Sequence, residues 1–154
     1  MPVIKFAKNH ASALWKVSAF AVFVVCCALN FSGMMYGDQS ATFNAAVTLI
    51  YVAFWVAYHV FNAKRKSSLT LSIVFSAVLL LSALLGTVTM WTGFAFGGLV
   101  FIAIPAITPL YGIAAVTMNF AATYIAMDVL AAGWLFAGIL LRRRHVPDIY
   151  SLIN

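Results

Sequence analysis

A single aspartate, Asp128, interrupts an apolar run over residues 119–141 that leads into three arginines. On insertion scales, a carboxylate near the centre of a membrane helix costs about 2.5–3.5 kcal/mol. The nine Leu, Ile, Phe and Val residues of this run return roughly 4 kcal/mol together. Because the two contributions nearly cancel, the sequence predicts that Asp128 faces other helices or water, or takes up a proton, and does not face lipid as an anion. Tyr124, one turn earlier, adds a hydroxyl on the same face.

Three further polar residues are predicted to lie at the depth of Asp128. Each of the four is thirteen to sixteen residues from a basic cluster, roughly 20–24 Å along a helix: Asn30 from Lys16, Tyr51 from Lys64, Ser82 from Lys66 and Asp128 from Arg142. We therefore predict a polar cluster of these four residues, with Tyr124 beside it, in the outer half of a membrane. Two interpretations stay open: hydrogen bonds that hold helices together, or a site for a ligand, an ion or a proton.

His59 is the second candidate for chemistry. It adjoins a stripe of side chains at helical spacing, Tyr51, Trp55, Tyr58 and Asn62. One interpretation is the wall of a haem or quinone site with His59 as a ligand. We favour the other, an aromatic belt at the membrane interface with a polar cap. Axial haem ligation between two helices needs a second intramembrane histidine, and the remaining two, His10 and His145, lie outside the apolar runs.

The remaining reactive residues do not form a catalytic motif. Cys26 and Cys27 are adjacent, so on a helix their side chains point about 100° apart and are predicted to be small apolar residues without a disulfide. No HExxH, GxSxG, P-loop or Rossmann motif occurs, and the chain has only three acidic residues, Asp38, Asp128 and Asp148. An enzyme is therefore the less favoured interpretation, and no metal or cofactor is expected.

The elements that position these residues are predicted from composition. Of 154 residues, 65% are hydrophobic and 8% charged, whereas soluble domains carry about 25% charged residues. A chain this short has too much surface to hide so many apolar side chains from water. Four runs reach the roughly 20 residues that a membrane helix needs: 14–35, 43–63, 69–90 and 119–141. We predict an all-α membrane protein, a four-helix bundle that forms one domain over residues 1–154.

Residues 93–116 are apolar but contain Gly93, Gly97, Gly98, Pro105, Pro109 and Gly112. Such a density of helix interrupters predicts a broken element, re-entrant or interfacial, on the outer side of the membrane. Broken backbone is tolerated at membrane depth only where protein or a water-filled cavity covers it. The alternative is a true fifth span, which would carry the arginine triplet to the outside.

All nine basic residues fall into three clusters at the ends of apolar runs: Lys5, Lys8 and Lys16; Lys64, Arg65 and Lys66; Arg142, Arg143 and Arg144. With four spans, every cluster lies on one side, which the positive-inside rule identifies as the cytoplasm. We expect an integral protein of a bacterial cytoplasmic membrane, with both termini cytoplasmic. The clusters suit anionic lipid headgroups, and nucleic acid is not an expected partner.

Three functions are consistent with this pattern. We favour a small non-enzymatic membrane protein that acts by association, as an accessory or regulatory subunit or a protector of a membrane complex. Small residues on one face of the last run, Ala122, Ala126, Gly133 and Ala137, suit a tight bundle or contact with a partner membrane protein; the alternative is that alanine is simply common in this sequence. The alternative function is an oligomeric transporter or channel component that uses Asp128 to pass a proton, a cation or a small amphiphile. A redox or lipid-modifying enzyme is the third.

Overall fold

The structure, a computed structural model, describes residues 2–36, 41–63, 66–93 and 98–143, and every regular element in these ranges is a helix. Four are long: α1 (Pro2–Tyr36), α2 (Ala41–Asn62), α3 (Lys66–Thr92) and α6 (Phe120–Arg143). Each contains a stretch long and apolar enough to cross a membrane: Ala13–Tyr36, Thr42–Asn62, Ser68–Thr92 and Phe120–Arg143. The all-helical class is confirmed, and so are four helices long and apolar enough to span a membrane, whose apolar stretches match the predicted runs within two residues.

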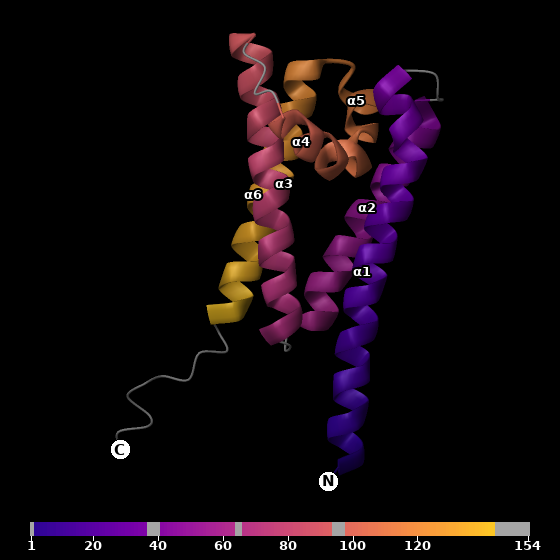
Figure 1. Cartoon of the computed structure of the whole chain (residues 1–154), viewed down its shortest axis with the longest axis vertical. Helices are drawn as coiled ribbons and strands as arrows, with labels where there is room; N and C mark the ends of the chain where they lie inside the picture. The colour runs from indigo at the N-terminus through magenta and orange to yellow at the C-terminus, as the bar shows by residue number, and fades with distance from the viewer. Residues whose placement is uncertain (1, 37–40, 64–65, 94–97, 144–154) are drawn as a thin grey trace.

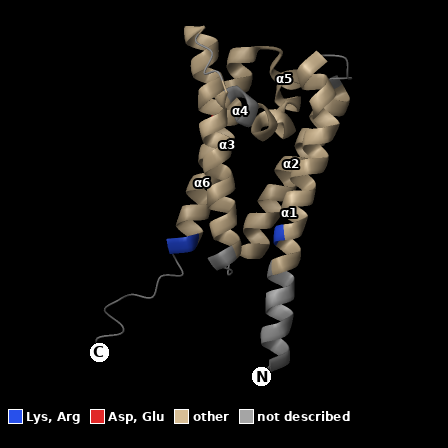
Figure 2. Ribbon diagram, viewed as in Figure 1, with Lys and Arg blue, Asp and Glu red and all other residues tan. Residues whose placement is uncertain are grey.

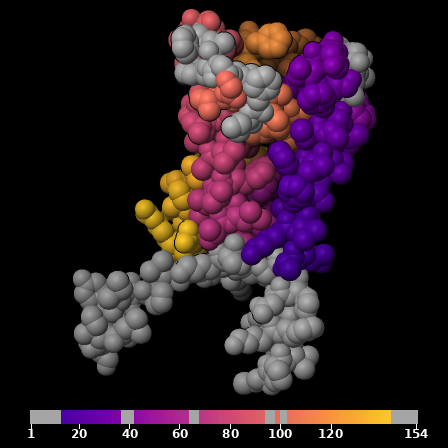
Figure 3. All heavy atoms as spheres, in the orientation of Figure 1, coloured from indigo at the N-terminus to yellow at the C-terminus, as the bar shows by residue number. Residues whose placement is uncertain are grey.

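The long helices form two antiparallel pairs, α1 with α2 and α3 with α6 (Figure 1). The α3–α6 pair has the most extensive contact, and α3 also touches α1 and α2. Figure 3 shows α1 lying against α3 on one face of the bundle. The described Lys and Arg side chains, Lys16, Arg142 and Arg143, lie at one end of the long helices (Figure 2). The other six basic residues, and Asp38 and Asp148, lie outside the described side chains.

The segment predicted to be broken is broken. It forms α4 (Leu99–Ile107), a 3-10 turn η1 (Thr108–Leu110) and α5 (Gly112–Thr117). These short elements lie at the end of the bundle opposite the basic side chains, between the two helix pairs (Figure 1). At 1.5 Å per residue, α4 is about 14 Å long, less than half of a hydrocarbon core of roughly 30 Å. A fifth span is therefore not formed in the described part of this segment.

The turn from α5 into α6 explains where the last span begins. Met118 takes the left-handed conformation that commonly ends a helix, with φ 51° and ψ 20°. Asn119 then caps α6, because its Oδ1 accepts a hydrogen bond from the backbone N–H of Ala122 at 3.1 Å. The hydroxyls of Thr117 and Thr123 are 2.7 Å apart and connect α5 to α6.

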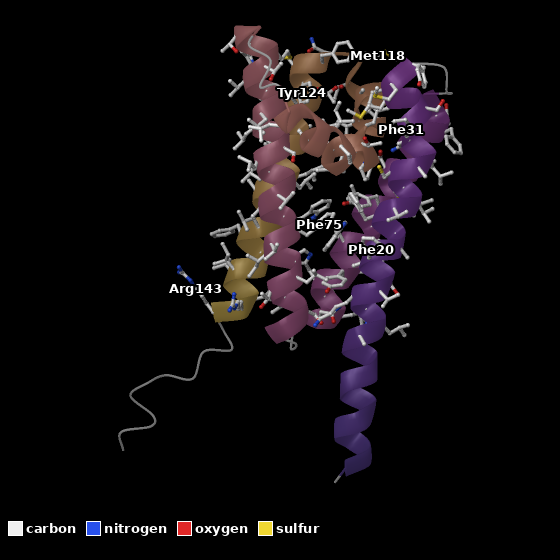
Figure 4. The ribbon with its side chains drawn as sticks, in the orientation of Figure 1. Phe20, Phe31, Phe75, Met118, Tyr124 and Arg143 are labelled. Carbon is white, nitrogen blue, oxygen red and sulfur yellow. The ribbon has the colours of Figure 1, made fainter. Side chains whose placement is uncertain are left out.

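Aromatic side chains join the two helix pairs. Trp55 of α2 stacks on Phe75 of α3 with ring centroids 4.8 Å apart, and it also contacts Trp134 of α6 at 6.1 Å. Figure 4 shows Phe75 pointing between the pairs. The predicted interfacial belt is thus wrong, since all four residues of the stripe are buried in the core: Tyr51, Trp55, Tyr58 and Asn62.

The face that α6 turns towards the bundle is not the one that carries the small-residue stripe. Its buried residues are Thr123, Met127, Ala131, Trp134 and Gly138. The small-residue stripe lies on another face, where Ala122 and Gly133 are exposed and Ala126 and Ala137 are half-buried. Tight packing of that stripe within the bundle is therefore wrong, and contact with another helix stays a prediction.

Candidate functional site

Asp128 lies half-buried on α6, where it faces α3. The hydroxyl of Thr87 donates a hydrogen bond to its Oδ2 at 2.7 Å. Its other oxygen, Oδ1, is buried without a partner, and Asp128 has no ion pair in the described part of the chain. A carboxylate can accept about four hydrogen bonds. One is filled here, so Asp128 has free capacity for a proton, a cation or a polar ligand.

Asn30 of α1 has partners other than Asp128. Its Nδ2 donates to the carbonyl oxygen of Pro109 at 3.1 Å and contacts the hydroxyl of Thr48 at 3.2 Å. The Thr48 hydroxyl itself donates to the same carbonyl at 2.8 Å, and it accepts from the backbone N–H of Gly112 at 2.9 Å. Asn30 and Thr48 therefore bind the backbone at η1 from two helices.

Pro109 also leaves a carbonyl of α4 without its usual helical partner. Pro109 has no N–H, so it cannot donate to the carbonyl of Pro105 four residues earlier, as a helical residue would. That carbonyl instead accepts from the thiol of Cys27 at 3.7 Å. Side chains of α1 and α2 thus hydrogen-bond the backbone carbonyls at both prolines.

Tyr51 lies in the aromatic core and not beside Asp128. Its ring contacts Trp55 and Trp134 with centroids 6.3 and 6.2 Å apart. Its hydroxyl and the indole Nε1 of Trp55 are both buried without a partner among the described residues. Tyr51 therefore packs the two helix pairs together and leaves one polar atom unsatisfied.

Ser82 and Tyr124 do come together, in the lining of one cavity of about 340 Å³. This cavity lies between α1, α3, α4 and α6. The Tyr124 ring packs directly on Gly86, at a position where any Cβ would meet it. Figure 4 shows Tyr124 near the end of the bundle that holds α4 and α5. Asp128, one turn further along α6, is not part of the lining.

The predicted cluster is thus divided among four places: the η1 network, the aromatic core, the cavity lining and the Asp128–Thr87 contact. No hydrogen bond in the described chain joins any two of Asn30, Tyr51, Ser82 and Asp128. Counting residues from the basic clusters estimates depth along each helix, but it does not give the direction in which a side chain points. Whether Asp128, Ser82 and Tyr124 serve a ligand or an ion stays a prediction. Sequence reasoning also missed Thr48 and Thr87, because threonines are frequent in these helices and no spacing distinguishes these two.

His59 is buried and fully hydrogen-bonded. Its Nδ1 lies 2.8 Å from the carbonyl oxygen of Trp55, which can only accept, so Nδ1 carries the hydrogen. Its Nε2 then accepts from the Ser72 hydroxyl at 2.7 Å. A serine hydroxyl on a histidine nitrogen also occurs in acyl-transfer enzymes. Here, however, Ser72 is fully buried, and neither residue lines the cavity of 340 Å³ or a second one of about 250 Å³.

The two adjacent cysteines do not form a disulfide. Both are free, with Cys26 buried and Cys27 half-buried. Among the described residues, no three His, Cys, Asp or Glu side chains gather closely enough to hold a metal ion. Comparison with protein-family models, with curated proteins and with solved structures finds no match for this chain. The function is therefore argued from the geometry of these side chains alone.

Proposed function

We propose that this chain is a small polytopic membrane protein that acts by association, as an accessory or regulatory subunit or a protector of a membrane complex. Its contact surface would be the exposed small-residue face of α6, and its partner a second copy or another membrane helix. Small residues let two helix backbones approach closely, which drives association where lipid removes the hydrophobic advantage of packing.

The glycines supply the observation that carries this proposal. At four of them a Cβ would crowd an atom of a neighbouring element, which would have to shift: Gly33, Gly86, Gly112 and Gly138. Gly133 lies inside α6, and a Cβ there would meet nothing within 4 Å, as is also the case at Gly93 and Gly98 outside the long helices. Glycine in a helix interior is less favourable than alanine by about 1 kcal/mol in water. Its small size at Gly133 has no use within one copy, so we infer a use between helices.

A pair of neighbouring substitutions tests this contact. Gly133→Leu places a bulky side chain on the small-residue face, while Ala132→Leu places the same side chain about 100° around the helix. Both positions are exposed. After crosslinking in native membranes and mild extraction, Gly133→Leu should lose the dimer or the co-purifying partner, and Ala132→Leu should keep it. Loss in both variants, or in neither, would contradict the proposal.

We further propose that the basic end of the bundle faces the cytoplasm of a bacterial cell, which leaves both termini inside and α4–α5 as a re-entrant or interfacial element at the outer side. The grouping of described Lys and Arg side chains at one end supports this orientation (Figure 2). The same side chains would contact anionic lipid headgroups. A cysteine placed after Arg144, in a Cys26→Ala/Cys27→Ala background, should react with an impermeant maleimide only from the cytoplasmic side. Labelling from outside intact cells would reverse the topology.

The surroundings of Asp128 support a second proposed function, the passage of a proton or cation in an oligomeric transporter. The supporting observation is its buried oxygen without a partner, beside the single hydrogen bond from Thr87. Ionisable residues inside membranes commonly mark ion pathways. In proteoliposomes, Asp128→Asn should abolish pH-gradient-driven flux, while Thr87→Val, which keeps the carboxyl group, should retain part of it. A wild-type protein without flux would leave only the association proposal.

A further inference from the structure

The cavity between α1, α3, α4 and α6 contains none of the residues on which the two functions proposed above depend. It is separate from the small-residue face of α6, and Asp128 does not line it. Its walls are Met34 of α1, one face of α3, three residues of α4, and Phe120 and Tyr124 of α6. Phe120 is 69% exposed, so the cavity reaches the outer surface of the bundle. In a membrane, that surface is in contact with lipid, and apolar molecules can enter from there.

Three hydroxyl groups on this lining have no partner in the protein. Ser82 and Thr89 belong to α3, two turns apart on one face, and Tyr124 faces them from α6. None of the three side chains makes a hydrogen bond within the described residues. Ser82 gives the strongest indication of a ligand, since it is only 3% exposed and it lines the cavity. A hydroxyl that opens into an apolar cavity has no hydrogen-bond partner there, which is unfavourable, and a ligand oxygen in the cavity would supply one.

The rest of the lining sets the class of that ligand. No charged side chain contributes to it, and most of its members are aliphatic or aromatic. An ionic headgroup would therefore be desolvated without compensation. The volume of 340 Å³ is within the range of small-molecule sites. Because an engineered apolar cavity of about 150 Å³ holds one benzene molecule, this one has room for about a dozen carbon and oxygen atoms.

Two features of the lining suit a small apolar ligand. Met34 and Met90 have flexible, polarizable side chains that follow the shape of an irregular apolar body. Gly86 allows the Tyr124 ring to lie flat against α3 and to form a wall of the cavity. Without the space at Gly86, the ring would have to move.

We propose that this cavity binds a neutral, single-chain or single-ring amphiphile of about a dozen non-hydrogen atoms, whose hydroxyl or carbonyl oxygen pairs with Ser82, Thr89 or Tyr124. The apolar body lies against α3 and α4. The ligand enters from the lipid phase, and the acyl chains of bulk phospholipid do not replace it because they bring no oxygen to these hydroxyls.

The probe for this site is photoreactive 1-decanol, with a diazirine in the chain, added to the full-length protein in lipid nanodiscs. Irradiation should label α3 or α4 at the cavity lining, as mapped by mass spectrometry of the peptides. Unlabelled 1-decanol should compete, while decane and decyltrimethylammonium should compete poorly. Equal competition by decane would overturn the proposal, since it would mean a void that any hydrocarbon fills.

Two alanines of α4 provide matched variants. Ala103 lines this cavity and Ala106 lines the second one, and each is 8% exposed. Ala103→Leu should abolish labelling and Ala106→Leu should leave it unchanged. Equal labelling of the two would overturn the site. If Ala103→Leu does not fold, Ser82→Ala serves in its place, because it adds no volume. It should remove the advantage of 1-decanol over decane, and an unchanged advantage would contradict the role of the hydroxyls.

Discussion

The side-chain amide of Asn30 on α1 donates a hydrogen bond to the carbonyl oxygen of Pro109 in η1, 3.1 Å away. Seventy-nine residues separate the two in the chain. The contact connects a polar residue in the apolar stretch of α1 to the non-helical turn between α4 and α5. Thr48 shares the same carbonyl, so a small polar network holds the non-helical backbone at this end of the bundle.

Substitution of this network should destabilise the fold. Asn30→Leu removes one donor to the Pro109 carbonyl, and interhelical hydrogen bonds of this kind contribute about 0.6 kcal/mol, with a maximum near 1.7 kcal/mol. Thr48→Val should cost more, since its hydroxyl bonds Asn30, Pro109 and Gly112. Equilibrium unfolding by SDS in mixed micelles measures both free energies.

The neighbouring substitution Leu29→Ala provides the control, because Leu29 is exposed on the outer face. The double variant Asn30→Leu/Thr48→Val should cost less than the sum of the single variants, as expected for residues of one network. Strict additivity would show that Asn30 and Thr48 act independently.

Gly112 is predicted to tolerate no side chain. A Cβ on Gly112 would meet the backbone carbonyl of Asn44, so α5 would have to move away from α2. Overpacking in a filled interior typically costs about 1–3 kcal/mol of folding free energy. We expect a cost near the upper end at Gly112, because the neighbouring atom belongs to the backbone and cannot rotate away. Gly112→Ala should therefore lower the free energy of unfolding strongly. Gly133→Ala, where the Cβ meets nothing, should be neutral or slightly stabilising. Similar effects at the two glycines would argue against the close α2–α5 crossing.

The long helices and the break between α3 and α6 were predictable from the sequence, but the direction in which their side chains point was not. The four spans follow from hydropathy and the break from Pro105 and Pro109, because lipid imposes length and backbone satisfaction on any helix. Lipid tails, however, are as apolar as a protein core. An aromatic stripe such as that of Trp55 can therefore face lipid or the protein core, and hydropathy does not distinguish the two. Counting residues predicted that Asn30 and Asp128 would meet, but their partners depend on helix rotation and on where the Pro109 carbonyl lies.

Two serines one turn apart on α3 should respond in opposite directions. Ser72 donates to Nε2 of His59 at 2.7 Å, so Ser72→Ala leaves a buried nitrogen without a partner, at a cost of about 1–3 kcal/mol. The Ser76 hydroxyl is itself buried without a partner. Ser76→Ala therefore removes an unsatisfied group and should be neutral or stabilising. Unfolding in mixed micelles compares the two variants directly, and a larger loss from Ser76→Ala would mean that its hydroxyl has a partner in the membrane.

The aromatic contact between the helix pairs should matter more than any single hydrogen bond. Trp134 is 8% exposed and touches both Tyr51 and Trp55 of α2. Truncating a buried aromatic side chain leaves a cavity and costs about 3–5 kcal/mol in water-soluble cores. Trp134→Ala should approach the lower end of that range, because Tyr51 and Trp55 then lose their partner on α6. Phe136→Ala, on the same helix but 64% exposed, should have little effect on unfolding. If the two truncations cost the same, α6 is held to the bundle by α3 alone, and the two helix pairs do not depend on the aromatic core to stay together.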